Sequence, residues 1–358
     1  MDVLTLDGSH GEGGGQILRT ALSLSAITAR PFRIVNIRAS RRNPGLMPQH
    51  LAAVRAAATI SGATVSGDRL GSAELDFAPR HSPTAGSYVF DVAETAERGS
   101  AGSATLILHT LLVPLGLAEG ASALALRGGT HVEWSPPFDH VVNSYLPMLC
   151  RMGFRMTVEL KRWGWYPLGQ GEIVCTVSAR SGEGTTARPR PIDLPARGAL
   201  QRIGGRAVAA NLPAHIPQRM ADRARASLSD LDVPVHIEPQ RVTAACPGAG
   251  IFLIAEYEEL PASFTAYGRL GKPSEAVADE AVAALREHHA SNAAVELHLA
   301  DQLLLPLAFA SGVSTFTTLR PSGHLMTNAW TIGQFGIADI SIEQGMPCGV
   351  RVEPRGWH

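Results

Sequence analysis

Hydrophobic residues follow one recurring order along the chain: a helical pattern, a short turn and two strand-like runs. The helical segments, at 47–62, 138–153 and 216–231, carry apolar residues three and four positions apart. The runs after each of them alternate between polar and apolar residues or are rich in Val, Ile, Phe and Tyr. This repeat predicts an α/β (α+β) fold of several similar units, each with its helices on one face of a sheet.

Two segments that contain glycine, proline and basic residues interrupt the pattern, at 181–198 and 267–276. Such composition is typical of linkers and long loops. Because insertions are best tolerated at surface loops, we expect a small α/β domain, residues 185–270, to be inserted into a large domain made of residues 1–184 and 271–358. A simple continuation of one sheet through this region is the alternative.

The composition limits the class of protein. With 358 residues, 45% of them hydrophobic and 18% charged, the chain can fold into large buried cores. The net charge of −1 means that any site for a polyanion must be local. The four cysteines are widely spaced, the start of the chain is not a signal peptide, and the most apolar run, 104–118, is too short to span a membrane. We therefore expect a cytoplasmic protein with no membrane partner.

The stretch HGEGGGQILRT, residues 10–20, joins a strand-like run to a helical pattern. Glycines let the backbone approach a ligand closely, and the start of the following helix offers free N–H groups to an anion. The stretch lacks the Gly-Lys-Ser/Thr of a P-loop and the GxGxxG spacing of dinucleotide-binding folds. Its spacing alone fits a tight structural turn as well as an anion site.

A basic segment, FRIVNIRASRRNPGLMPQH at 32–50, follows the glycine stretch. Arginines on a strand and on the loop behind it can bind phosphate through two hydrogen bonds each. A run of basic residues is usually a solvated face. Here it ends in a Pro-Gly turn and is expected beside the glycine stretch, which favours a phosphate-rich ligand.

Seven segments in this order resemble the RNA 3′-terminal phosphate cyclase family. The first two are GEGGGQILR and IRASRRNPGLMPQH, and together the seven span nearly the whole chain. Residues 185–270 match least. The later five segments are GSAGSATLIL at 99–108, GGTHVEWSPPFD at 128–139, GWYPLGQGE at 164–172, HLADQLLLPLA at 298–308 and PSGHLMTN at 321–328.

The resemblance implies a fold and a reaction. Members of this family have a large domain of repeated βαβαββ units and a small inserted α/β domain. With ATP they convert an RNA 3′-phosphate into a 2′,3′-cyclic phosphate, by way of a covalent histidine–AMP and an RNA-(3′)pp(5′)A intermediate. The implied partners are therefore ATP and an RNA with a 3′-terminal phosphate, and the implied cofactor is a divalent metal, Mg or Mn.

The resemblance also assigns residues. It places His324, between a Pro-Ser-Gly turn and a helical pattern, at the position of the nucleophile. Glu12 is implied as the metal ligand, although a glutamate stabilised at a helix start is the alternative. The other positions that the resemblance places at ATP or at the terminal RNA phosphate are Gln16, Arg19, Arg38, Arg41, Gln49, His109, Pro136, His298, Asp301 and Gln302.

Four of these positions need comment. Pro136 and His298 match the pair that holds adenine, where some relatives carry tyrosine in place of His298. His109 stands where glutamine is expected. Asp301, on an otherwise apolar helix, needs a buried partner, so a capping or core-pairing role is the alternative to a contact with ATP. Arg42 has no counterpart and is left unassigned.

Two other functions are compatible with parts of the sequence. The first is a non-catalytic RNA-binding or ribosome-assembly factor of the same fold, and the intact PSGHLMTN segment with Glu12 and Asp301 speaks against it. The second is an enolpyruvyl transferase, which has a similar repeated architecture. That chemistry needs no histidine nucleophile and uses lysines, of which the chain has two, Lys161 and Lys272. Exposed sheet edges make a homodimer plausible.

Overall fold

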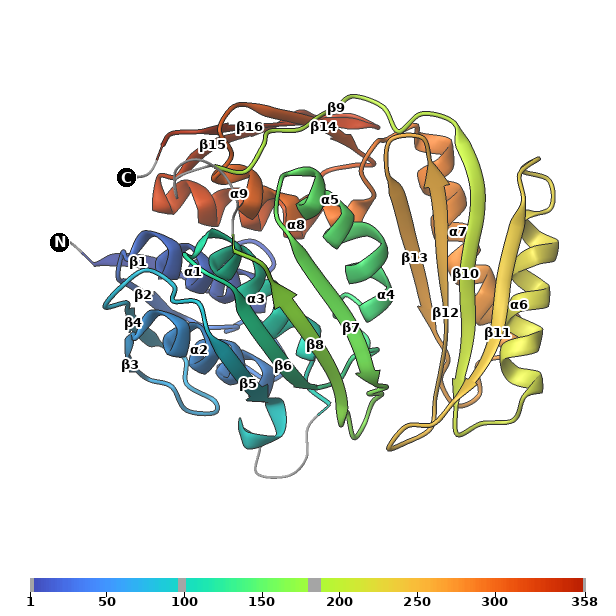
Figure 1. Cartoon of the computed structure of the whole chain (residues 1–358), viewed down its shortest axis with the longest axis horizontal. Coiled ribbons are helices and arrows are strands. Elements are labelled where there is room, and N and C mark those ends of the chain that lie inside the picture. The colour runs from blue at the N-terminus through green and yellow to red at the C-terminus, as the bar shows by residue number, and fades with distance from the viewer. Residues whose placement is uncertain (1–2, 96–100, 180–187, 357–358) are drawn as a thin grey trace.

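A computed structural model describes residues 3–95, 101–179 and 188–356 (Figure 1). Residues 99 and 100 of the segment at 99–108, and residues 181–187 of the predicted linker, lie outside the described residues. Within the described part, the strands form four sheets of four strands each. Three of the sheets share one strand order, first–second–fourth–third, so the predicted repeat of βαβαββ units is confirmed.

The first unit is the clearest example of the repeat. Its order is β1-β2-β4-β3, with β1 parallel to β2 and the other pairs antiparallel. Helix α1 forms because apolar residues from Ile17 to Ile27 bury one face against the sheet and the neighbouring helices. Its elements are β1 Leu4–Asp7, α1 Gly15–Thr28, β2 Phe32–Val35, α2 Pro48–Ser61, β3 Thr64–Ser66 and β4 Leu75–Ala78.

The second unit repeats this order as β5-β6-β8-β7. Its first helix, α3, is buried along nearly its whole length, as expected for the most apolar run of the chain. Its elements are β5 Ser87–Asp91, η1 Val92–Thr95, α3 Ala104–Leu117, β6 Ser122–Gly128, α4 Phe138–His140, η2 Val141–Tyr145, α5 Leu146–Arg151, β7 Met156–Arg162 and β8 Gly171–Val177.

The third unit is interrupted between its first strand and its first helix. Strand β9 pairs in parallel with β14, although about a hundred residues of chain separate β9 from α8. The sheet order is β15-β16-β14-β9. Its elements are β9 Asp193–Leu194, α8 Leu297–Ala308, β14 Ser314–Thr318, α9 Gly323–Phe335, β15 Ala338–Ile342 and β16 Cys348–Pro354.

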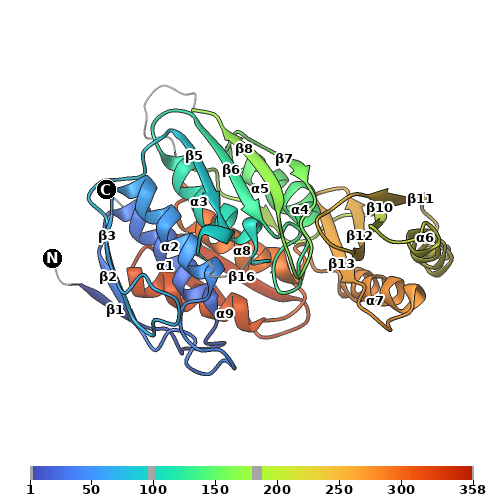
Figure 2. The same ribbon diagram turned by 90° about the horizontal axis from the view of Figure 1, so that it is seen from below.

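The intervening chain forms an inserted unit with its own sheet, β11-β10-β12-β13, and its own apolar core. It projects from one end of the three repeated units (Figure 2). Its elements are β10 Leu200–Ala210, α6 His215–Leu228, β11 Val235–Val242, β12 Gly248–Tyr257, β13 Pro261–Tyr267 and α7 Ser274–Ser291.

The elements that pack together as the inserted unit do not coincide with the expected limits of 185–270. Strand β9 lies inside those limits but pairs with β14 of the third unit. Helix α7 lies outside them, yet Val277, Ala281 and Leu285 belong to the core of the inserted unit. We therefore propose 200–291 as its extent, and the division into domains stays a prediction.

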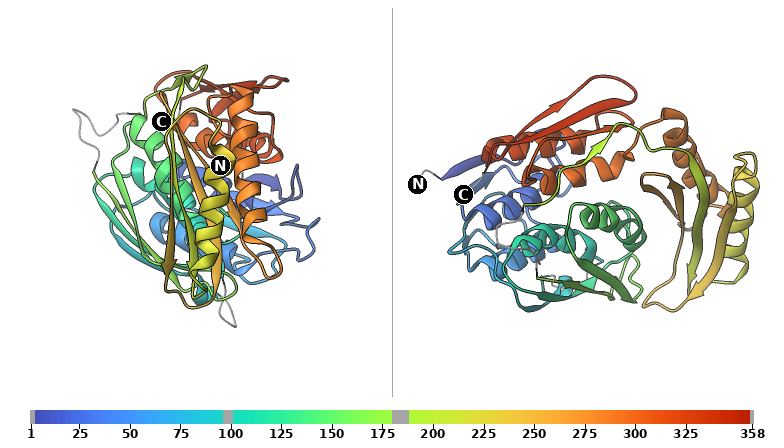
Figure 3. Two further views of the ribbon diagram at one scale, coloured as in Figure 1. Left: turned by 90° about the vertical axis from the view of Figure 1, so that its right-hand side faces the viewer. Right: turned by 45° about the horizontal axis from the view of Figure 1, so that its top comes forward.

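The three repeated units place their helices inward and their sheets outward (Figure 3). Helices α1, α2, α3, α8 and α9 pack against one another, and one continuous apolar core includes residues of all three units. Because the helices converge, their N-terminal ends and the loops before them come together from distant parts of the sequence. Among the described residues, none of the helices combines the length and hydrophobicity needed to cross a bilayer.

Candidate active site

The starts of helices α1 and α9 lie beside each other. Helix α1 begins at Gly15 and packs against α9, which begins at Gly323. Gly11 and Gly13 have φ of 57° and 56°, which is a backbone conformation that glycine adopts without strain. Gly14 provides no side-chain cap, so the first N–H groups of α1 lack that partner and suit an anion.

Glu12 and His324 face each other across these helix starts. The Nδ1 atom of His324 lies 3.0 Å from Oε2 of Glu12, although the two groups are not aligned as a hydrogen bond. Arg41 donates from Nη2 to the carbonyl oxygen of Glu12 over 2.9 Å, and the same atom lies 4.0 Å from its carboxylate. The structure thus brings together three of the predicted site residues, from the glycine loop, the basic segment and PSGHLMTN.

The surroundings of His324 favour the neutral ring. Burial lowers its pKa below the usual 6.5, and the nearby cationic Arg19 and Arg41 lower it further, whereas Glu12 raises it. The net shift is downward. An imidazole that is neutral at pH 7 keeps a lone pair on one ring nitrogen and can act as a nucleophile.

Gly323, the first residue of α9, leaves room for the side chain of Glu12. A Cβ atom at this position would lie 2.7 Å from Oε1 and 2.8 Å from Cγ of Glu12. We expect Gly323→Ala to change the free energy of unfolding by less than about 1 kcal/mol, since the carboxylate can swing away and alanine suits a helix. Because that movement separates Glu12 from His324, reaction at His324 should slow by about tenfold or more.

The matched control is Gly333→Ala in the same helix, where no atom lies within 4 Å of the added methyl group. It should leave the reaction unchanged and stabilise α9 by up to about 1 kcal/mol. The two variants are compared by thermal unfolding and by the rate of labelling with α-labelled ATP. Equal labelling rates would show that Gly323 does not hold Glu12 in place.

A buried polar cluster lies behind Glu12, along α1, α8 and α9. Arg19 donates from Nη2 to Oε1 of Gln16 over 2.6 Å, and Gln16 Nε2 lies 3.4 Å from Oδ2 of Asp301. Asn328 donates to the carbonyl oxygen of Asp301 over 2.9 Å and accepts from the hydroxyl of Thr20. Burial lowers the pKa of Arg19 to about 10.

Asp301 is the most strongly shifted acid of the cluster. Burial, with Glu296 and Glu12 nearby, raises its pKa from 3.8 to about 8, although Arg19 opposes the shift. Its carboxyl group is therefore protonated at neutral pH in the free protein. A neutral buried carboxyl can donate a hydrogen bond, which suits a contact with a ribose or base as well as a pairing role in the core.

The raised pKa of Asp301 predicts a pH dependence of stability. Between pH 4 and 8 the folded protein holds a proton that the unfolded chain has released, so stability falls as the pH rises through this window. We expect wild type to lose on the order of 2 kcal/mol between pH 6 and 8 from this group. Asp301→Asn cannot ionise, so its loss over the same range should be smaller.

Urea unfolding at pH 6 and pH 8 measures this difference. Asp339→Asn is the control, because this exposed carboxylate pairs with Arg355 and its pKa is lowered, so its titration falls below the range tested. Parallel curves for wild type and Asp301→Asn would contradict the raised pKa.

Two predicted site residues of the basic segment make hydrogen bonds within the protein. Arg38, with φ of 55°, donates from Nη1 to the carbonyl oxygens of Asn43 and Gly45 over 2.6 and 3.0 Å. Gln49, at the start of α2, accepts from the backbone N–H of Ser103 over 3.2 Å and so links the starts of α2 and α3. These bonds engage only Nη1 of Arg38, so its other guanidinium nitrogens keep N–H groups that could bind phosphate.

Of the pair predicted to hold adenine, Pro136 lies just before α4 and His298 at the start of α8, while the predicted ATP ligands His109 and Gln302 lie within α3 and α8. The carbonyl oxygen of Pro136 accepts from Thr105, over 2.6 Å. Gln302 accepts from Nε2 of His140 at 3.1 Å, whereas the side chain of His298 is exposed. His109 is stacked on Tyr145 at a centroid distance of 4.4 Å.

Among the residues predicted to contact ATP, His109 is buried with one ring nitrogen unpaired. Its Nε2 atom is buried without a hydrogen-bond partner, and burial lowers its pKa to about 3. A neutral ring with one unsatisfied nitrogen has a free position for a hydrogen bond. Whether ATP provides that partner stays a prediction.

Several residues of the site were not predicted from the sequence. Thr327 lies 3.4 Å from the backbone nitrogen of Glu12, and Asn328 bonds Asp301. Both belong to PSGHLMTN, so the motif contained the signal. His50 is buried, caps the start of α2, and its Nε2 atom lies 2.2 Å from where a Cβ on Gly15 would stand. Glu296 caps α8.

The metal prediction has limited support in the described part of the chain, where no group of three or more His, Cys, Asp or Glu residues could hold a metal ion. Glu12 supplies one half-buried carboxylate beside the helix starts. That donor set fits magnesium, which often binds one or two carboxylates and completes its shell with water and substrate phosphates.

Comparison with known proteins decides the family. The family model described as "RNA 3'-terminal phosphate cyclase" matches residues 10–342, which is most of the chain. The chain belongs to the RNA 3′-terminal phosphate cyclase family. This confirms the resemblance found in the seven segments.

Individual relatives agree over their full length. The chain is 53% identical to the RNA 3′-terminal phosphate cyclase of Methylococcus capsulatus, over 96% of this chain and 93% of that protein. It is 48% identical to that of Gloeothece citriformis, over 95% of both. Among solved structures, the enolpyruvyl transferase NikO of Streptomyces tendae aligns with 51% of this chain and 33% of its own, at 17% identity and a TM-score of 0.27.

Proposed function

We propose that this chain is an ATP-dependent RNA 3′-terminal phosphate cyclase, which converts an RNA 3′-phosphate into a 2′,3′-cyclic phosphate. One observation carries the proposal: His324 Nδ1 lies 3.0 Å from Glu12 where two helix N-termini meet. The free N–H groups of α1 and the nearby arginines suit a triphosphate. Membership of the family supplies the class of reaction.

His324 is proposed as the nucleophile that bonds the α-phosphorus of ATP while pyrophosphate leaves. Glu12 beside Nδ1 favours the tautomer with its proton on that atom, so the lone pair lies on Nε2, which we assign as the attacking atom. AMP then passes to the RNA 3′-phosphate. The vicinal 2′-hydroxyl attacks this activated phosphate, AMP departs, and the ring closes.

The other predicted site residues are assigned roles according to the chemistry of their side chains. Arg19 and Arg41 are proposed to bind phosphate oxygens, with Arg38 and Gln49 toward the terminal RNA phosphate. Asp301, protonated in the free protein, is proposed to donate toward the nucleotide. The residues proposed to surround adenine and ribose are Gln16, His109, Pro136, His298 and Gln302.

A divalent cation, magnesium or manganese, would be held by Glu12 together with phosphate oxygens. When bound it would neutralise charge on the phosphates and so help pyrophosphate to leave. The carboxylate would then serve both the cation and the orientation of His324.

The proposal is tested with a short RNA that ends in a 3′-phosphate, incubated with ATP and magnesium or manganese. We expect a product whose end resists phosphatase and migrates as a 2′,3′-cyclic phosphate, together with release of AMP. No conversion by folded protein that still binds RNA would instead favour the non-catalytic RNA-binding factor. A cytoplasmic location and a homodimer stay predictions.

A further inference from the structure

Arg206, on strand β10, connects the inserted unit to the second repeated unit. It donates from Nε to Oδ1 of Asp139 over 2.7 Å and from Nη2 to Oδ2 over 3.0 Å. Its guanidinium also lies 4.7 Å from the ring centre of Trp163. Asp139 is buried, with 7% of its side chain exposed, so this two-pronged pair is largely shielded from water.

Asp139 is fixed from its other side by a buried histidine. His131 Nε2 lies 2.9 Å from Oδ2 of Asp139, and His131 Nδ1 lies 2.8 Å from the hydroxyl of Thr130. That hydroxyl accepts from the backbone N–H of Gly164. Burial would raise the pKa of Asp139, but His131 and Arg206 outweigh it and lower the pKa. The carboxylate is therefore charged and held by three hydrogen bonds.

The segment that contains Asp139 also borders the predicted adenine site. The next residue, His140, contacts Oε1 of Gln302 at 3.1 Å, and its Nδ1 atom lies 3.7 Å from Glu296. Pro136 stands three residues before Asp139, and its carbonyl oxygen is held by Thr105. Residues 136–140 are thus held by α3 and α8 on one side and by the inserted unit on the other.

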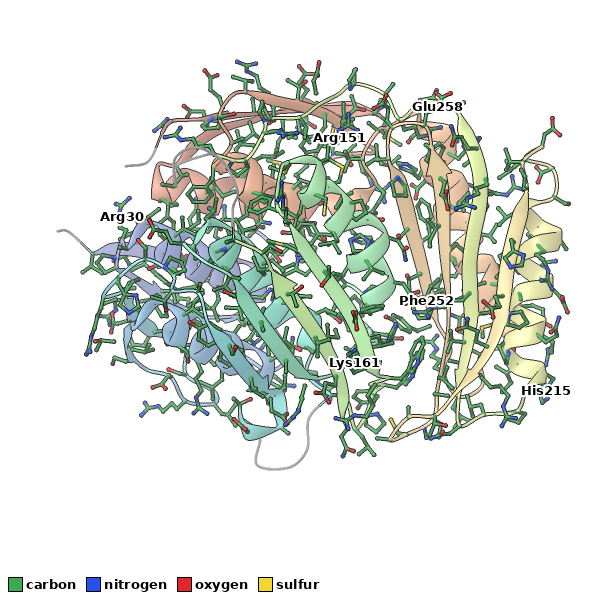
Figure 4. All side chains as sticks on the ribbon, in the orientation of Figure 1. Arg30, Arg151, Lys161, His215, Phe252 and Glu258 are labelled. Atoms are coloured by element: carbon green, nitrogen blue, oxygen red, sulfur yellow. The ribbon has the colours of Figure 1, made fainter. Side chains whose placement is uncertain are left out.

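Other contacts also join the inserted unit to the repeated units, among them a hydrogen bond of 2.7 Å between the buried hydroxyls of Ser144 and Ser263. In the described chain, the ion pairs Arg151–Glu259 and Arg320–Glu287 also cross, and their side chains are 42–52% exposed (Figure 4 labels Arg151). Exposed pairs of this kind contribute little. A small apolar cluster, which includes Phe252, packs beside Arg206 and Trp163 but carries no charge.

We propose that Arg206 is a positioning residue for the nucleotide site: through Asp139 it fixes residues 136–140 against α8 and so sets the affinity for the adenine end of ATP. The inference rests on the proposed nucleotide site. Removing Arg206 leaves a buried carboxylate without its main cation, and such a carboxylate draws water or moves. The backbone that carries Pro136 and His140 would move with it.

The test compares Arg206→Ala with two matched controls. Arg202 lies on the same strand and face and pairs with Glu256 inside the inserted unit, over 2.7 Å. Arg151→Ala breaks an exposed pair across the boundary that involves none of residues 136–140. Equilibrium binding of a non-hydrolysable ATP analogue and of inorganic tripolyphosphate is measured without RNA, together with KM and kcat for ATP in adduct formation.

For Arg206→Ala we expect the Kd of the analogue and the KM for ATP to rise about 5- to 30-fold, with kcat at saturating ATP within about twofold of wild type. Binding of tripolyphosphate, which has no adenine, should be unchanged. Arg202→Ala and Arg151→Ala should bind both ligands as wild type does.

Three outcomes would overturn the proposal: an unchanged Kd for the analogue, equal weakening of analogue and tripolyphosphate, or the same effect in Arg151→Ala. If Arg206→Ala does not fold, Arg206→Lys keeps the charge but loses one hydrogen bond, and its Kd should still rise severalfold. An unchanged Kd in that variant would also overturn it. Binding of the analogue needs no covalent step. If the proposed function is wrong, the wild-type protein binds the analogue but forms no covalent adduct, and this result is distinct from a failure of the proposal for Arg206.

Discussion

Replacing His324 with alanine is expected to abolish covalent attachment of AMP and to slow RNA cyclisation by at least about a thousandfold. The reason is that the proposed intermediate is a phosphoramidate on this ring, which sits 3.0 Å from Glu12 at the junction of α1 and α9. The measurement is labelling with α-labelled ATP. In wild type the label should survive denaturation, be lost in acid and persist in alkali.

His215→Ala is the matched control, because this exposed histidine begins α6 of the inserted unit and should label as wild type does. Label that persists in His324→Ala would place the adduct on another residue. A wild-type protein that takes no label, although it is folded and binds ATP, would favour the non-catalytic factor.

The pH dependence of labelling tests the state of the ring. Because the pKa of His324 lies below 6.5, the ring is neutral at pH 7 and above. The rate constant for labelling at saturating ATP should therefore be level above pH 6.5 and fall only as the pH drops through the lowered value. A rate that falls already between pH 7.5 and 6.5 would contradict the lowered pKa.

The repeat of units could be predicted from the sequence because helix periodicity and strand alternation are local properties. The assignment of single elements near the limits of the inserted unit could not be predicted in this way. Strand β9 is only two residues long, and it is a strand because β14 supplies its partner after residues 200–291 have intervened. Helix α7 has an apolar face that would suit either core, and only packing assigns it to the inserted unit.

In the site, too, residues within motifs could be predicted from the sequence, whereas contacts between distant segments could not. Ordered motifs predicted Glu12 and His324 as site residues, and the fold brings their side chains into contact. The sequence did not indicate that Arg38 would satisfy two carbonyls of its own loop. Nor did it indicate that Arg206, from the region that matches the family least, would hold Asp139 of a motif, because only the packing of the inserted unit against α4 brings the two residues together.

Glu12→Gln is expected to reduce labelling and cyclisation by on the order of a hundredfold or more. Glutamine keeps the size of the side chain but removes the charge that faces His324 Nδ1 at 3.0 Å and the carboxylate proposed for the cation. Glu74→Gln is the control, since it removes one charge from an exposed pair with Arg33 in the same unit and should leave both rates unchanged.

Titration with magnesium or manganese distinguishes the roles proposed for Glu12. If the carboxylate holds a cation, Glu12→Gln should need a higher metal concentration for half-maximal labelling, and excess metal should restore part of the rate. If it only orients His324, the rate falls but the midpoint of the metal titration stays that of wild type. If Glu12 merely stabilises the start of α1, its removal costs about 0.3–1 kcal/mol of stability and labelling is unaffected, which would contradict both proposed roles.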